Sequence, residues 1–185
     1  MDYSDLWDYV ANAFYKAFEV HGDYLWPRLA DKFFSYSGIK QYRLSELLGS
    51  GKSYRDRECC VFDILSESVV LEWCKTKEAL LIVGRVISLV ISEGGKRIVN
   101  PLVISLLSEY GDNKDFTSEI SANFNSRSWM GSLVPYLEED KAILLPLLKH
   151  SSPKVKEWAV HFIENIDHQI EYETNRELER KIRQF

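Results

Sequence analysis

Apolar residues recur at intervals of three and four along most of this chain, which is the spacing of one face of an α-helix. A first stripe runs through Val10 and Phe14 and ends before a polar His-Gly-Asp segment. A second stripe follows Pro27, a residue that is tolerated in the first turn of a helix. The helices predicted for this part are residues 3–20, 27–34 and 44–48.

The same spacing continues through the rest of the chain, interrupted by turn residues. Gly94 and Gly95 are expected to end one helix, Pro101 to open another, and the Gly-Asp-Asn of residues 111–113 to stop it. We expect no strand pair and no hairpin dipeptide. The helices predicted for this part are residues 61–74, 77–92, 101–107 and 116–124, one in the first half of residues 128–163, and a long last helix over residues 153–182.

Helices joined by short turns predict an all-α fold, either an irregular helical bundle or a right-handed stack of helix pairs. The chain has 185 residues, of which 45% are hydrophobic, and this suits one globular domain. We therefore expect a single helical domain over residues 1–185. Residues 49–57 are the least apolar stretch of the first half and predict a mobile loop.

The net charge of −5 argues against nucleic acid as the main partner, because neutralising a phosphate backbone needs a dominant cationic surface. The acidic start of the chain lacks the cationic region and apolar run of a secretory signal. The longest apolar stretch, residues 79–91, contains Arg85 and is shorter than the roughly 20 residues of a membrane-spanning helix. These features predict a cytoplasmic protein that binds no membrane.

No cofactor and no metal site is expected. The three cysteines form no Cys-x-x-Cys pair, so they indicate reduced thiols rather than disulfides or zinc ligands. His161, Glu164 and His168 share one face of the last helix and could meet a metal ion. Because that face lies opposite the apolar stripe and no other segment offers a further ligand, a solvated polar face is the preferred interpretation.

The candidate catalytic residues are also better interpreted as surface or structural residues. Gly-Ser-Gly-Lys-Ser at residues 49–53 resembles the end of a phosphate-binding loop, but Glu46 stands where that motif needs a glycine. The carboxylates of residues 138–140 diverge around a helix axis, which favours a solvated surface over an acid–base pair. Cys59 and Cys60 are not part of a recognisable nucleophile arrangement. We therefore expect no enzymatic activity.

The most regular pattern lies near the end of the chain. An apolar segment, residues 143–150, is followed by a turn, and Pro153 then begins a helix that Ser152 can cap. This arrangement resembles the second helix of a HEAT-type repeat, and the resemblance implies a HEAT-like stack of helix pairs. The positions that match the repeat are Pro153, Val155, Lys156, Ala159 and Ile163.

A longer pattern covers about residues 61–180. Ser-Trp-x-Gly-Ser-Leu-x-Pro-Tyr at residues 128–136, a helix, His-x-x-Pro-x-Val-Lys-x-Trp-Ala at residues 150–159 and a charged tail are similar to the C-terminal helical segment of large bacterial multidomain proteins. Some of those proteins belong to anti-phage and other conflict systems. The segment is not their catalytic part, so the resemblance implies a recognition, scaffold or regulatory module with an attached or neighbouring effector domain.

Two places are candidates for partner binding. Arg127 and Trp129 are of the types enriched in interface hot spots, although packing of the tryptophan under its turn is the alternative. In the last helix, Leu178 and Ile182 continue an apolar i, i+4 stripe. A helix of about 40 Å is longer than a neighbour of about 20 residues can cover, so its end is expected to project. Docking onto a partner helix and a solvated helix end are the two interpretations of that stripe.

These features predict a non-catalytic protein-binding module, in keeping with a bacterial defence system. The alternative is a stand-alone immunity or antitoxin-like protein, whose acidic surface covers a basic toxin. A third interpretation is a helical-repeat DNA glycosylase, against which the acidic balance argues. The expected partner is a protein or an effector domain.

Overall fold

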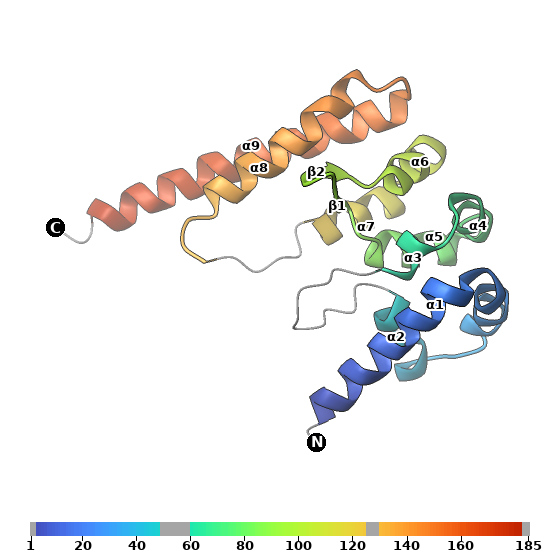
Figure 1. The fold of residues 1–185 in the computed structure, drawn as a ribbon. Coiled ribbons are helices and arrows are strands. Elements are labelled where there is room, and N and C mark those ends of the chain that lie inside the picture. Colours follow the sequence, from blue (N-terminus) through green and yellow to red (C-terminus); the bar gives the residue numbers. More distant parts are fainter. Residues whose placement is uncertain (1–2, 49–59, 125–129, 183–185) are drawn as a thin grey trace. The chain divides into compact units, whose positions relative to one another are not determined.

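A computed structural model of the protein describes residues 3–48, 60–124 and 130–182 (Figure 1). The contacts within the chain divide it into two compact units, Met1–Leu89 and Val90–Phe185. Both units are mainly helical, so the all-α class is confirmed at that coarse level. The single helical domain over residues 1–185 stays a prediction, and the loop predicted at residues 49–57 lies outside the described residues.

The first unit opens with α1 (Tyr3–Phe33), which is followed by α2 (Ile39–Leu48). The turn predicted between two separate helices is a kink inside α1, where His21 has non-helical backbone angles (φ −132°, ψ 23°). Pro27 also lies inside α1. A proline there removes one main-chain hydrogen bond of the preceding turn and favours a bend. The chain therefore changes direction without leaving the helix.

The helix predicted over residues 61–74 is wrong, because Leu65 and Ser66 adopt extended backbone and separate two shorter helices. The helix predicted over residues 77–92 ends early, because Ile87 is extended (ψ 142°). The helices of this part are α3 (Val61–Ile64), α4 (Glu67–Trp73) and α5 (Lys77–Val86).

Aromatic rings fill the core of the first unit. Trp26 of α1 meets Phe62 of α3 and Trp73 of α4 edge-on, with ring centroids 5.6 and 5.0 Å apart. Phe33, at the end of α1, also meets Trp73 edge-on at 5.7 Å. Each such pair contributes about 0.5–1.5 kcal/mol beyond the burial of its surface. These contacts fix which face of α1 is turned into the unit.

The second unit opens with a β-hairpin, so the expectation of no strand pair is wrong. Strand β1 (Val90–Glu93) pairs antiparallel with β2 (Lys96–Val99). Gly94 and Gly95 connect the strands with φ values of +57° and +78°. Positive φ at both central residues is the geometry of a tight type I′ hairpin turn, which glycine adopts without strain. The two glycines therefore form the turn between β1 and β2 instead of ending a helix.

Helices make up most of the described residues in the rest of the second unit. The last helix, α9, packs along α8 and also contacts α6 and the 3₁₀ helix η1 (Figure 1). It begins and ends at the residues that the sequence pattern gives for it. The elements are α6 (Pro101–Tyr110), α7 (Lys114–Phe124), α8 (Val134–Leu144), η1 (Leu145–Lys149) and α9 (Pro153–Ile182).

The first half of α9 forms the centre of this second core. Its apolar side chains recur at the predicted three-and-four spacing on the side where α9 packs against α6, η1 and α8. The apolar residues whose spacing predicts a packed helix are therefore the ones that are buried. The buried residues of the stripe are Val155, Trp158, Ala159, Phe162, Ile163 and Ile166.

Candidate functional site: the two halves of helix α9

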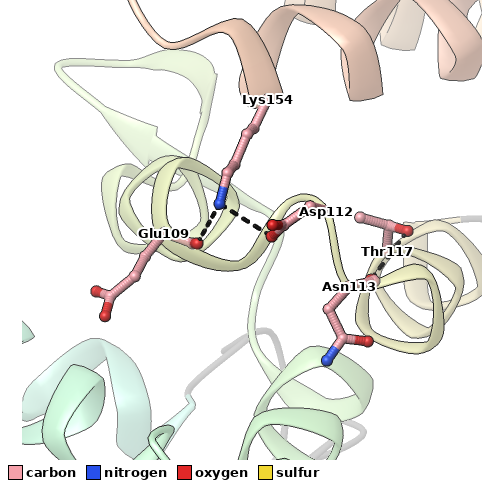
Figure 2. Close-up of polar contacts among 5 residues, drawn as sticks. All are labelled: Glu109, Asp112, Asn113, Thr117 and Lys154. Atoms are coloured by element: carbon pink, nitrogen blue, oxygen red, sulfur yellow. Dashed lines mark hydrogen bonds and ion pairs between the residues drawn. The ribbon is translucent and has the colours of Figure 1, made fainter.

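The first turn of α9 is attached to the turn between α6 and α7 through Lys154 (Figure 2). Its Nζ donates hydrogen bonds to the main-chain oxygen of Glu109, 2.7 Å away, and to Oδ1 of Asp112, 2.9 Å away. Glu109 lies in the last turn of α6, where main-chain carbonyls lack partners and the helix dipole favours a cation. The hydrogen bond from Lys154 also lowers the pKa of Asp112. One side chain of α9 thus caps α6 and binds the turn.

Gly111 lies in the same turn and has no room for a side chain. A Cβ there would lie 2.4 Å from the main-chain oxygen of Leu107 and 2.9 Å from Cβ of Lys154. The φ of Gly111 is −65°, so close approach is the reason for glycine. Asn113 accepts a hydrogen bond at Oδ1 from the main-chain N–H of Phe116, 3.2 Å away, and caps α7. The Gly-Asp-Asn segment, predicted only to stop a helix, therefore also joins α6, α7 and α9.

Helix α7 contacts α9 through Trp158. The indole Nε1 donates a hydrogen bond to Oγ of Ser121, 3.2 Å away. The indole also stacks on Phe162, with ring centroids 5.2 Å apart and planes at 9°. Phe162 in turn meets Phe124 edge-on at 5.0 Å. The inner face of the first half of α9 is therefore occupied by its own unit.

Helix α8 is attached to the middle of α9 by an ion pair between Nζ of Lys141 and Oδ1 of Asp167, 2.6 Å apart. A second ion pair joins Arg97 of β2 to Glu139 of α8 at 2.7 Å. Both pairs are partly exposed, so each contributes about 1 kcal/mol at most. Their value here is geometric, because the first pair joins α8 to α9 at a fixed position.

The second half of α9 continues past these neighbours (Figure 1). Ile166 is 2% exposed and is the last buried residue of α9 among the described side chains, and Ile170 is half-buried. Farther on, Tyr172, Leu178 and Ile182 are 66%, 52% and 73% exposed. The helix from Ile170 to Ile182 is about 18 Å long. The structure therefore places both tail candidates, Leu178 and Ile182, at the surface of an extended helix.

The other binding candidates, Arg127 and Trp129, lie outside the described residues and stay predictions. Met130, which follows them directly, is 90% exposed. Gly131 has a φ of +80° and a Cβ there would meet nothing within 4 Å. Its backbone conformation is therefore the reason for glycine at this position.

The metal candidates of α9 lie at the surface. Nδ1 of His161 is 3.5 Å from Oε2 of Glu164, and both side chains are more than half exposed. His168 is also exposed. In the parts of the chain that the structure describes, no three His, Cys, Asp or Glu side chains could hold a metal ion together. These residues therefore have the arrangement of a solvated helical face.

The carboxylates of α8 diverge, but the expectation that all of residues 138–140 are solvated is wrong. Asp140 is only 2% exposed. It shares a helical face with Leu137 and Leu144, which are buried at 3% and 0% exposure. Glu139 is exposed and forms the ion pair with β2. Asp140 lies three residues after Leu137 and four residues before Leu144. This spacing is the signal in the sequence that indicates its burial.

Cys60 is a buried structural thiol. Its Sγ donates a hydrogen bond to the main-chain oxygen of Leu48, 3.3 Å away. Burial raises the pKa of Cys60 far above the ordinary range of a thiol. Because the thiolate is the nucleophilic form, this residue is poorly reactive. Cys59 and the Gly-Ser-Gly-Lys-Ser of residues 49–53 lie outside the described residues.

Comparisons with protein-family models, with curated proteins and with solved structures gave no match to this chain. Within the described ranges, no helix is both long and apolar enough to cross a membrane. The functional argument therefore depends on the surface of the protein itself, and above all on the two unlike halves of α9.

Proposed function

We propose that this chain is a non-catalytic protein-binding module of the cytoplasm, and that the second half of α9 is its docking surface. The observation that carries the proposal is the exposure of Leu178 and Ile182 on a helix that continues past its packing neighbours. Apolar side chains at helical spacing are the anchors by which a helix docks onto a partner helix or groove. The first half of α9 holds the surface rigidly, because its inner face is packed.

We also propose that α6–α7 and α8–η1–α9 are two helix pairs of a HEAT-like stack. In support, α9 contacts α6 as well as α8, and Lys154 and Trp158 join the two pairs. The outer face of α9 carries Glu157, His161 and Glu164, which are exposed. Terminal repeats of helical stacks have such a polar outer face. The partner therefore binds the projecting half of α9 and not this face.

The resemblance to helical segments of bacterial conflict proteins supports a role in anti-phage defence. In this proposal, an attached or neighbouring effector domain carries out the chemistry, and this chain recognises or regulates it. The net charge of −5 supports a protein partner over nucleic acid, whose phosphates repel an acidic surface.

Affinity capture from native lysate, followed by mass spectrometry, tests the proposal with three baits. These are the unchanged chain, Leu178→Asp/Ile182→Asp, and the matched control Val160→Asp. Val160 is 41% exposed on the first half of the same helix. We expect proteins that the unchanged chain and the control capture and the double variant loses. Identical protein sets with all three baits, or capture of no protein, would contradict the proposal.

Filter binding to duplex DNA separates this function from that of a DNA glycosylase. At a salt concentration of about 50 mM, where phosphate contacts are strong, we expect no retention of DNA above background. Retention that falls steeply with added salt would favour the glycosylase and would contradict a protein as the main partner.

A further inference from the structure

The two strands of the β-hairpin differ in their neighbours. Helix α8 packs against β2, and Arg97 of that strand forms an ion pair with Glu139 of the helix. Strand β1 forms main-chain hydrogen bonds with β2 and with no other part of the chain that the structure describes. Within its unit, the outer edge of β1 is therefore an unpaired strand edge.

The tight turn determines which main-chain groups of β1 point outward. Because the loop has two residues, Glu93 and Lys96 flank it and exchange both of their main-chain hydrogen bonds. Bonded and non-bonded pairs then alternate along an antiparallel ladder, so Ile91 bonds to β2, whereas Ser92 and Val90 do not. The N–H and C=O groups of Ser92 and Val90 therefore point away from β2.

This edge has the regular geometry that a further strand requires. Natural edge strands are protected by lysine, by proline, by a β-bulge or by very short length. Strand β1 is short, with four residues, but its register with β2 is unbroken and it contains neither lysine nor proline. Ser92 and Glu93 are exposed, and Val90 and Ile91 are half-buried. The edge of β1 is therefore open to pairing over its whole length.

We propose that an extended peptide segment of a partner protein adds to the edge of β1 as a third, antiparallel strand. The outward N–H and C=O groups of Ser92 and Val90 specify this occupant, because an extended main chain presents acceptors and donors at the matching spacing. Antiparallel pairing is the more stable form per residue. The inference goes beyond the proposed function, since β1 is a different surface from the second half of α9.

The side chains of β1 indicate the composition of the peptide. Successive side chains of a strand point to opposite faces, so Ile91 and Glu93 lie on the same face. The carboxylate of Glu93 forms no ion pair with a described residue, although Lys96 lies opposite it on β2. A cationic side chain opposite Glu93 and an aliphatic one opposite Ile91 complement these neighbours. From its N-terminal end, the antiparallel peptide is therefore cationic, then any residue, then aliphatic.

Hydrogen exchange of the full chain, followed by NMR, tests the proposal. In the free protein the ladder should protect the amides of Ile91 and Glu93, while those of Val90 and Ser92 should exchange rapidly. The probe is the peptide acetyl-Thr-Lys-Thr-Ile-Val-Thr-amide, whose lysine would lie opposite Glu93. At about 5 mM, it should slow exchange of Val90 and Ser92 about sixfold, as expected for a Kd of about 1 mM.

Two results of this measurement would overturn the proposal. Slow exchange of Ser92 in the free protein would mean that another segment of the chain already covers the edge. Unchanged exchange of Val90 and Ser92 at about 5 mM peptide, five times the Kd of about 1 mM, would mean that the edge does not accept a strand.

Ser92→Pro and Ser92→Thr test main-chain pairing. Proline removes one outward N–H and spares the ladder with β2, as it does in natural edge strands. The peptide should then no longer protect Val90, while protection of Ile91 shows that the hairpin is intact. Threonine keeps the N–H, so Ser92→Thr should bind the peptide within twofold of the unchanged chain. Equal binding of the peptide by the two variants would contradict strand addition.

Exchange of charges tests the contact at Glu93 and repeats the test if Ser92→Pro does not keep the hairpin. Glu93→Lys/Lys96→Glu retains one charge of each sign across the hairpin. It should bind the original peptide at least threefold more weakly than the unchanged chain does. A peptide with glutamate in place of its lysine should show the opposite preference. Equal affinities of both peptides for both forms of the chain would overturn the proposed pairing.

Discussion

Interactions that are individually weak determine how the helices of the second unit pack together. The ion pair between Lys154 and Asp112 is partly exposed, and such a pair alone contributes little. The same ammonium group also caps the end of α6, and it reaches that position only because Gly111 has no side chain in the way. The close approach at Gly111 is therefore the most sensitive point of this junction.

Gly111→Ala should destabilise the protein by about 1–3 kcal/mol, the usual cost of forcing an extra group into a packed site. The matched control is Gly22→Ala, whose Cβ would lie at an ordinary 3.5 Å from Cδ2 of Leu65. The control should change stability by less than about 1 kcal/mol, and toward greater stability, since alanine favours the helix. Urea denaturation followed by circular dichroism measures both. Equal stabilities of the two variants would mean that α9 can move away from the turn without cost.

The Asp112 carboxyl should titrate below its ordinary pKa of 3.8, because Lys154 donates a hydrogen bond to its charged form. A group with a lowered pKa in the folded state stabilises the fold above its unfolded-state value and loses that effect as the pH falls through the folded value. The melting temperature of Asp112→Asn should therefore be lower than that of the unchanged chain near pH 6. The difference should disappear as the pH falls through the lowered pKa of Asp112. In the Lys154→Met variant, NMR titration should show that the pKa of the Asp112 carboxyl has shifted back toward 3.8. If the titration midpoint of Asp112 is the same with and without Lys154→Met, the hydrogen bond from Lys154 is not the cause of the lowered pKa.

At the scale of elements, the sequence predicts helices well where one face is apolar over several turns. Helix α9 has the bounds that its Pro153 start and apolar stripe predict. The pattern fails after residue 86, because the apolar run of residues 79–91 is compatible with a buried helix and with a strand. The Gly-Gly pair decides between them, because it can form a hairpin turn as well as end a helix. The spacing of apolar residues within one segment does not show whether the segment after the Gly-Gly pair forms a strand that pairs with it.

Deleting residues 177–185 should remove the projecting end of α9 and leave the fold intact. Leu178 and Ile182 are mostly exposed, so their loss should lower the melting temperature by no more than about 3 °C, the shift expected for less than about 1 kcal/mol. Binding to the captured partner should weaken at the same time. A truncated chain that is unfolded at room temperature would show that the tail belongs to the core.

At the scale of the whole molecule, composition and periodicity predict a mainly helical globular protein, but long-range packing decides where its surfaces are. Leu178 and Ile182 could be proposed from an i, i+4 stripe that extends beyond any neighbour of ordinary length. Which face of α1 is buried could not be assigned in this way. Apolar residues occupy both faces of the helix, and only contacts with distant aromatic residues such as Trp73 decide which face is inside.

The most direct test of the central proposal measures binding of a purified partner, obtained by the capture experiment, to three forms of the full chain. Calorimetric titration should give the same Kd for the unchanged chain and for Val160→Asp. Leu178→Asp/Ile182→Asp should bind at least tenfold more weakly, because two charges would be placed in an apolar contact. Equal affinity of all three forms would contradict the proposal that the projecting half of α9 is the docking surface.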